Sequence, residues 1–334
     1  LYTEQDALDT LELLVEVPFE TAHEVVPGVT ATWQRAGHIL GAASIRTRVD
    51  GRTVVFSGDL GRSTHPLLLP PDPISTADVV VCESTYGDRD HEDGSVEDTL
   101  AEVVLDAVAQ AGVVVAPAFA VDRTEIVLWH LDRLTAEGRI PPLPVFVDSP
   151  MALRALAAYR EAAAEDSPEL RPEVRRTPLF GALDLREAPT VEQSKAINER
   201  RGPFVVISAS GMATGGRVLH HLAGRLGSSR NTVLLVGFQA PQTRGDLLSQ
   251  GADAVKIHGT YRPVRARVEH VRLSAHADRS DLIDWLGSAS DPPEVVYVVH
   301  GEEDSSRALA HLVNDTTESL GVVPRLGERV TLGP

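Results

Sequence analysis

The sequence predicts an α/β protein whose strands are largely parallel, and three patterns support this. Short continuous apolar segments recur through the middle of the chain, and they alternate with segments whose apolar residues follow helical spacing. Continuous rather than alternating apolarity is typical of strands covered on both faces, as in parallel α/β sheets. Several apolar runs also end in His, Asp or Glu beside a glycine or a turn, which places these side chains at one rim of a sheet.

The first part of the chain predicts short strands. Val29–Arg35, Ala43–Val49 and Thr53–Ser57 are rich in β-branched residues, and Asp50-Gly51 supplies a hairpin turn between the last two. After a proline-rich loop, a further strand is expected over Asp78–Glu83.

Beyond Gly87 helices and strands alternate. The helical spacing of apolar residues, followed by a glycine, predicts helices that end near Gly112 and Gly138, and an Ala-rich helix is expected over Met151–Glu165. Four continuous apolar strands are expected at 113–116, 144–148, 204–208 and 233–237. From Ser274 onward the pattern predicts a loop and then a helix, a strand and a helix, at 280–286, 295–299 and 305–312.

Composition limits the classes of protein to consider. The 334 residues are 43% hydrophobic, enough for one large domain or two ordinary ones. A single cysteine, Cys82, excludes a disulfide framework and a cysteine-based zinc site. No apolar run approaches the ~20 residues of a membrane span, and no signal peptide is recognised, so a soluble cytoplasmic protein without membrane contact is expected. A homodimer is left open.

The net charge of −17 argues against nucleic-acid binding through bulk charge. Only two of the 31 basic residues, Lys195 and Lys256, are lysines. Arginine suits bidentate contacts to phosphate, so a local arginine-lined groove remains compatible with the acidic total.

Five candidate site residues follow strands or lie in short loops between predicted elements: His38, Asp59, Glu83, His276 and His300. Each has a plain structural interpretation by itself. Asp59 is in a sequence typical of a turn, His276 could be an exposed loop residue, and a carboxylate that ends an apolar strand, as Glu83 does, is costly unless it is paired. Five such residues at one kind of location instead favour a shared rim, an arrangement typical of metal-dependent hydrolases.

A separate candidate is the glycine- and hydroxyl-rich turn that leads from the strand at 204–208 into a helix. Its residues Ser210, Gly211, Gly215 and Gly216 could offer backbone N–H groups to a phosphate. The turn lacks the Lys-Ser/Thr of a Walker A motif and is not a dinucleotide fingerprint. A tight packing turn explains the same residues almost equally well.

Six ordered motifs, spread over essentially the whole chain, carry a family resemblance: Ala36-Gly37-His38, Ser57-Gly58-Asp59, Glu83-Ser84-Thr85-Tyr86-Gly87, Ser208-Ala209-Ser210-Gly211-Met212, Ser274-Ala275-His276-Ala277-Asp278 and Val299-His300-Gly301-Glu302. Together they resemble the β-CASP branch of the metallo-β-lactamase fold. The chain looks most like the bacterial and archaeal RNA-processing nucleases related to the cleavage-and-polyadenylation endonuclease subunit. The resemblance implies an αββα metallo-β-lactamase sandwich, here without its N-terminal part, formed by residues 1–87 and 274–334, with an inserted parallel α/β β-CASP domain at 88–273.

The resemblance also implies roles for the candidate residues. His38 would complete a first zinc site, Asp59 would bridge two zinc ions, and His300 would bind the second. Glu83 and His276 would form the acid pair that serves the leaving group. The implied activity is zinc-dependent hydrolysis of RNA phosphodiester bonds, either endo- or exonucleolytic.

One departure from the family pattern matters. The His-x-His-x-Asp-His motif, which supplies four metal ligands in the family, has no match in the 334 residues. We therefore expect an N-terminally truncated nuclease that binds zinc poorly and is inactive as printed, because stable zinc sites normally have at least three protein ligands.

Two other functions compete with a truncated ribonuclease. A non-catalytic β-CASP paralogue could bind RNA or scaffold a complex, but such a protein has no reason to keep all five candidate residues. A DNA-repair nuclease of the same superfamily is disfavoured because that branch usually has another residue in place of His300.

Overall fold

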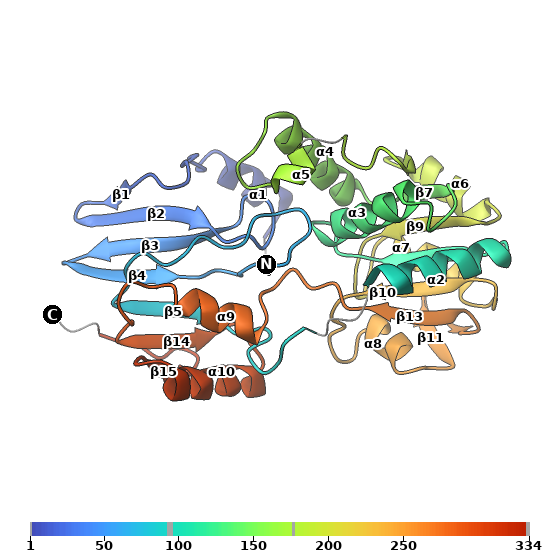
Figure 1. Ribbon diagram of the computed structural model, residues 1–334. Helices are drawn as coiled ribbons and strands as arrows, with labels where there is room; N and C mark the ends of the chain where they lie inside the picture. The colour runs from blue at the N-terminus through green and yellow to red at the C-terminus, as the bar shows by residue number, and fades with distance from the viewer. Residues whose placement is uncertain (1, 92–95, 176–177, 332–334) are drawn as a thin grey trace.

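The computed structural model of the protein describes residues 2–91, 96–175 and 178–331, and these form two α/β bodies, each built around its own sheet. The two sheets lie side by side in Figure 1, the first on the left and the second on the right. The chain starts in the first body, crosses into the second after strand β5 (Val79–Glu83), and returns to the first through helix α9 (Arg279–Leu286).

The first sheet combines an antiparallel and a parallel half. Its seven strands follow the order β1-β2-β3-β4-β5-β14-β15, with antiparallel pairing from β1 to β4 and parallel pairing from β4 to β15. The bounds of the strands besides β5 are β1 His23–Val26, β2 Val29–Arg35, β3 Ala43–Val49, β4 Arg52–Phe56, β14 Val295–Val299 and β15 Leu320–Val322. The predicted hairpin at Asp50-Gly51 is confirmed, since both residues have positive φ between β3 and β4.

Helices α9 and α10 (Glu303–Thr316) pack on one face of this sheet. Alternate residues of the parallel strands, such as Val80 and Val298, are buried against Leu282 and Leu309 of the two helices. The apolar stripe of α10 is thus explained by its place on the sheet. This face holds the core of the first body.

The second sheet is entirely parallel and covered on both faces, as the continuous apolar strands predict. Its order is β13-β10-β6-β9-β7-β8. The strands are β6 Val113–Pro117, β7 Pro144–Val147, β8 Asp184–Glu187, β9 Phe204–Ser208, β10 Thr232–Val236 and β13 Arg267–Val271.

Successive residues of these strands enter two different cores. In β9, Val205 packs with helices α2 (Val96–Ala109), α3 (Arg123–Ala136) and α4 (Pro150–Ala164), whereas Val206 packs against the opposite helix layer. That opposite layer is formed by α6 Val191–Glu199, α7 Val218–Arg225 and α8 Arg244–Ser249. The remaining elements are α1 Glu4–Leu11, α5 Pro172–Arg175, β11 Ala254–Ile257 and β12 Thr260–Pro263.

The two edge strands of the second sheet escape sequence prediction. β8 and β13 are mostly polar, with an Asp, an Arg and a Glu in β8 and an Arg, a Glu and a His in β13. An edge strand has one side open to solvent and needs no continuous apolar run. The helices also differ at their ends from the predicted ones: α10 begins two residues before Ser305 and extends to Thr316.

Within the described ranges, no helix has both the length and the apolar character needed to cross a membrane.

A close backbone contact joins the loops that carry the candidate residues. Gly61 donates a hydrogen bond to the carbonyl of Ala36 and forms an isolated antiparallel bridge with His276. A Cβ added to Gly61 would lie 1.8 Å from the carbonyl oxygen of Gly37. Only glycine therefore fits here, and its small size lets the three loops meet.

A buried polar cluster ties the first body to the second. The side chains of His65 and Asp122 are both completely buried, and His65 Nε2 lies 3.1 Å from Asp122 Oδ2. His65 Nδ1 accepts two backbone N–H groups, so its Nε2 carries the proton that Asp122 accepts. Tyr159 donates to the other oxygen of Asp122 at 2.6 Å, and Arg123 also contacts this carboxylate. Burial alone would raise the pKa of Asp122, but these partners lower it.

Glu125 lies beside this cluster and has no such partners. Its side chain is buried, and neither carboxylate oxygen has a hydrogen-bond partner in the part of the chain that the structure describes. Burial raises the pKa of Glu125 from its ordinary 4.5 to about 8. The carboxyl therefore keeps its proton at neutral pH.

We predict that Gly61→Ala destabilises the protein by about 1–3 kcal/mol or more, because the new methyl group must displace backbone. Urea unfolding measures the change. Gly224→Ala is the matched control: Gly224 lies inside α7 with no atom within 4 Å of an added Cβ. This control should stabilise the helix by about 0.5–1 kcal/mol. Equal effects of the two substitutions would contradict the close-contact account.

A second prediction concerns Glu125→Gln. Between pH 4.5 and about 8 the folded protein keeps a proton that the unfolded chain releases, so the stability of the parent falls as pH rises through this range. The glutamine variant lacks this penalty. We expect it to be more stable than the parent by about 2–4 kcal/mol at pH 8, a difference that shrinks toward zero as pH falls to 4.5.

Urea unfolding across this pH range measures the Glu125 effect. Glu199→Gln, at an exposed position, serves as the control and should stay within about 0.5 kcal/mol of the parent throughout. A Glu125→Gln variant that is less stable than the parent at pH 8 would show that the carboxylate has a partner.

Candidate metal centre

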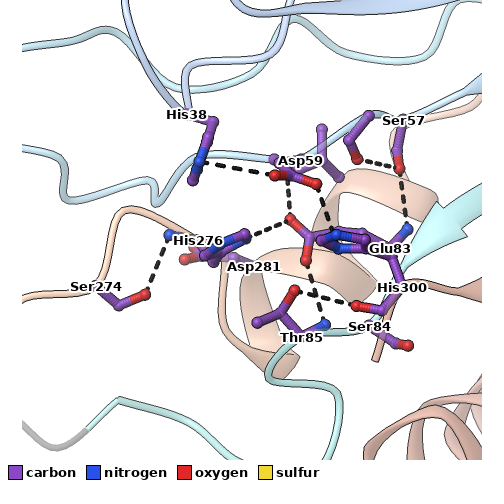
Figure 2. A network of polar contacts seen from close by, with 12 residues as sticks. His38, Ser57, Asp59, Glu83, Ser84, Thr85, Ser274, His276, Asp281 and His300 are labelled. Atoms are coloured by element: carbon purple, nitrogen blue, oxygen red, sulfur yellow. Dashed lines mark hydrogen bonds and ion pairs between the residues drawn. The ribbon is translucent and has the colours of Figure 1, made fainter. Parts of the chain in front are cut away.

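Three parallel strands of the first sheet end side by side and deliver the candidate residues to one rim. β4, β5 and β14 are neighbours in the sheet, and Asp59, Glu83 and His300 lie at or just beyond their carboxyl ends. The loop after β2 adds His38 and the segment before α9 adds His276. Figure 2 shows all five side chains gathered in one network. The predicted shared rim is confirmed.

Asp59 lies between two imidazoles. Its Oδ2 is 3.8 Å from His38 Nε2, and its Oδ1 is 3.3 Å from His300 Nδ1. The two oxygens of one carboxylate thus face two different histidines. The carboxylate thus links the two histidines.

His38, Asp59 and His276 each offer a ligand atom, and these atoms all lie within 4.8 Å of one another. The rings of His38 and His276 are 4.3 Å apart between centroids, and those of His276 and His300 are 6.4 Å apart. Among the described residues, this is the group of His, Cys, Asp or Glu side chains that could hold a metal ion.

The state of His38 fits a metal ligand. Its pKa is lowered to about 4, first by burial and then by the neighbouring His276 and Arg123, so the ring is neutral at pH 7. Neutral imidazole is the form that binds zinc. Its Nδ1 is buried and has no hydrogen-bond partner in the described part of the chain. Imidazole nitrogen and carboxylate oxygen are also the donors that zinc prefers in a site without cysteine.

Glu83 is a buried carboxylate that is fully paired. Its Oε1 accepts the N–H of Leu60 at 2.6 Å and lies 3.2 Å from His276 Nδ1, while Oε2 accepts the N–H of Thr85 at 3.2 Å. Burial alone would raise the pKa of Glu83, but the bonds from His276, Thr85 and Leu60 lower it. Glu83 therefore stays ionised and holds the His276 ring by its Nδ1 side.

The backbone around His276 is held by its neighbours. Its N–H donates to Ser274 Oγ at 3.1 Å, and its carbonyl oxygen lies 3.0 Å from His91 Nε2. The backbone N–H of His91 in turn donates to Asp278, the residue that caps helix α9. His91, which follows the Glu83 motif by a few residues, is thus a support for His276.

His300 has a left-handed backbone conformation, with φ of 59°, which is uncommon for a residue other than glycine. Its carbonyl accepts a hydrogen bond from Thr85, and the next residue, Gly301, packs directly on Ser84, where a Cβ would lie 2.4 Å from the carbonyl oxygen. Ser84 also donates to the carbonyl of Val299. These contacts hold His300 beside Asp59, although its side chain is 60% exposed.

The predicted phosphate turn lies apart from this network, at the carboxyl end of β9. Some of its polar groups bond within the turn: the Thr214 N–H donates to Ser210 Oγ at 3.0 Å. Gly216 has φ of 78°, and an added Cβ at Gly211 would meet Phe119 at 2.8 Å. The carbonyl of Gly211 accepts a bond from the side chain of Gln239. The turn therefore packs tightly against its neighbours, among them Phe119 and Gln239.

Arg123 is a residue that sequence reasoning did not select. Its side chain is almost buried, yet its charge acts on His38, whose pKa it helps to lower. The sequence signal was weak because Arg123 opens a predicted helix, where a charged residue is ordinary. Arg123 comes near His38 because the two bodies are in contact at this point.

Two family models match the chain. The Beta-Casp domain matches residues 124–248, and the Zn-dependent metallo-hydrolase RNA specificity domain matches residues 261–323. The second match contains His276 and His300. The Beta-Casp match lies within the residues that build the all-parallel sheet and its helices.

Similar proteins are found in all domains of life. A ribonuclease of Thermus thermophilus is 37% identical over 300 residues, which cover 89% of this chain and 68% of that protein. An RNase J-like protein of Methanocaldococcus jannaschii is 29% identical over 98% of this chain and 76% of its own length. Cleavage and polyadenylation specificity factor 73 of Drosophila melanogaster is 25% identical, over 92% of this chain and 45% of that protein.

A solved structure also shares the fold. A protein of unknown function from Enterococcus faecalis superposes with a TM-score of 0.52 at 12% identity, over 96% of this chain and 67% of that one.

Proposed function

The chain belongs to the β-CASP family of metallo-β-lactamase-fold nucleases, and we propose that it is a zinc-dependent ribonuclease that hydrolyses RNA phosphodiester bonds. One observation carries the proposal: the carboxylate of Asp59 has a different imidazole at each oxygen, His38 at one and His300 at the other. The ribonuclease names of two relatives and the zinc dependence of the matched family support the choice of RNA and of zinc.

For the metal, we assign His38, Asp59 and His300 as zinc ligands, with Asp59 shared between two ions. When bound, zinc supplies positive charge that stabilises the phosphodiester during attack by water. Catalytic zinc sites use three protein ligands and keep one position open. The assigned residues supply two ligands to each ion, His38 and Asp59 to one and Asp59 and His300 to the other, which is fewer than three. Weak zinc binding by residues 1–334 therefore stays a prediction.

For proton transfer, we assign Glu83 and His276. The ionised Glu83 holds the Nδ1 side of His276, which orients the imidazole and leaves its other nitrogen for the leaving oxygen of the RNA. A carboxylate behind an imidazole is also typical of metal-ligating histidines. The two roles of His276 differ in one measurable property, the zinc content of a variant without this ring.

For the substrate backbone, we propose that Ser210, Gly211, Gly215 and Gly216 hold a phosphate of the RNA away from the scissile bond. Their turn lies in the inserted domain, which we assign to 88–273, and the flanking segments 1–87 and 274–334 form the metallo-β-lactamase domain. The membership of β5 and β14 in one sheet, and of β13 in the other, supports these boundaries.

A cytoplasmic location fits the single buried cysteine, and a homodimer stays a prediction.

For the complete protein, with its zinc ions bound, we expect Asp59→Ala to abolish zinc binding and RNA cleavage together, because it removes the carboxylate shared by the two imidazoles. The loss should exceed the ~10–100-fold typical of residues that only support a ligand. Zinc content by mass spectrometry and cleavage of a labelled RNA measure both effects. Asp315→Ala, at an exposed position in α10, is the control and should match the parent. Full zinc content in the Asp59 variant would refute the metal assignment.

We expect His276→Ala to slow cleavage by about 10²–10⁴-fold while most zinc stays bound, as removal of a general acid does. The same two measurements apply, with His311→Ala at an exposed position as the control. If zinc is lost along with activity, His276 is a metal ligand and the acid role is wrong.

A further inference from the structure

A cavity of about 250 Å³ lies beside the metal centre, between the two bodies. One wall comes from the segment after β5, with Tyr86 and His91, and the other from Phe238, from His270 of strand β13 and from Arg272, which directly follows that strand. We propose that this cavity, the Tyr86–Phe238 pocket, binds one nucleotide of the RNA next to the scissile phosphate, with the base stacked on Phe238. The inference rests on the proposed function and specifies how the substrate is held.

The pocket shares residues with the support of His276. His91 and Ser274 line it, and both contact the backbone of His276, at 3.0 Å and 3.1 Å. The ring of Tyr86 lies 4.6 Å from that of His91 and 6.3 Å from that of His276. The pocket therefore adjoins the segment that carries His276, a place that suits a nucleotide next to the scissile bond.

The opposite wall presents an unoccupied aromatic face. Phe238 follows β10 and its side chain is 48% exposed at the cavity. In the described part of the chain it makes no ring or cation contact, whereas the Tyr86 ring already meets His91 and the Arg89 guanidinium. Nucleic-acid bases stack on such aromatic side chains regardless of sequence. Phe238, rather than Tyr86, is the free stacking surface.

The backbone holds Phe238 in this place. The preceding residue, Gly237, has φ of 80° and donates to the carbonyl of Val271. An added Cβ at Gly237 would lie 2.9 Å from the carbonyl oxygen of Leu273, and His270 Nε2 lies 2.7 Å from the Gly237 oxygen. The loop is thus fixed to β13, and the stacking surface needs little ordering when a ligand binds.

The charge of the lining selects an anionic aromatic ligand. In a chain of net charge −17, two arginines, Arg89 and Arg272, line the pocket, and Asp90 is the carboxylate among its described lining residues. Arg89 also meets the carboxylate of Asp88. The Asp90 carboxylate is itself engaged by Arg279 and by the backbone and hydroxyl of Ser280. An aromatic base with a phosphate matches a lining of an aromatic face and arginines.

The test measures equilibrium binding of a short fluorescent single-stranded RNA by anisotropy, together with a set of the same RNA in which one base at a time is removed. Phe238→Ala should weaken binding of the intact RNA about 10-fold. This loss should vanish for the one RNA whose missing base is the stacked base. Phe238→Trp should restore binding. Tyr261→Ala, at a more exposed aromatic on β12, should bind every RNA as the parent does.

An equal loss on every RNA, or no loss, overturns the pocket. Because binding is measured without cleavage, the two proposals separate. Binding that shows the missing-base pattern in a complete, zinc-loaded parent that does not hydrolyse RNA supports the pocket and refutes the ribonuclease. If the parent hydrolyses RNA but Phe238→Ala binds every RNA as the parent does, the pocket is refuted and the ribonuclease proposal stands. A parent protein that binds no RNA overturns both.

Discussion

The site depends on a single buried carboxylate. Glu83 is 1% exposed, and an ionised carboxylate in such a place is stable only when its oxygens are paired. Its three partners are Leu60, Thr85 and His276, which belong to three separate parts of the chain. Satisfying this one charge therefore brings the loop after β4 and the segment before α9 to the end of β5. Removal of any partner would leave charge uncompensated.

Around this anchor, close glycine contacts determine how near the loops approach. Gly61 packs on Gly37, and Gly301 packs on Ser84, so the residues next to them, including His38 and His300, face Asp59 rather than solvent alone. Backbone approaches of this kind cost no side-chain entropy and leave little freedom for the ligand loops. The candidate metal centre is thus positioned mainly by the backbone.

The sequence predicted the parts of this arrangement that follow from local pattern. Apolar runs that end in Asp, Glu or His were sufficient to infer a shared rim, because β4, β5 and β14 are parallel neighbours. Continuous apolarity was sufficient for the sheet covered on both faces. The family resemblance, which rests on ordered motifs, supplied the division into domains and the chemical roles, neither of which the local patterns contain.

Other features could not be read from the sequence because they arise from contacts between distant residues. The polar edge strand β13 has no apolar run and was not predicted, yet its His270 and the residue after it, Arg272, line the Tyr86–Phe238 pocket. The pairing of His65 with Asp122 joins the two bodies across 57 positions. A histidine in a loop and an aspartate before a helix are ordinary residues until the fold places them together. Whether His276 acts as a general acid or as a metal ligand likewise depends on its position to within a few ångströms, which the sequence does not give.

Anomalous diffraction at the zinc edge from a zinc-soaked crystal tests the central claim most directly. The account predicts a zinc peak beside Asp59, with the Asp59 carboxylate and the His38 ring each within about 2.0–2.2 Å of an ion. A zinc peak only at other histidines, such as the stacked surface pair His220 and His258, or no peak near Asp59, would contradict the assignment of this rim as a metal centre.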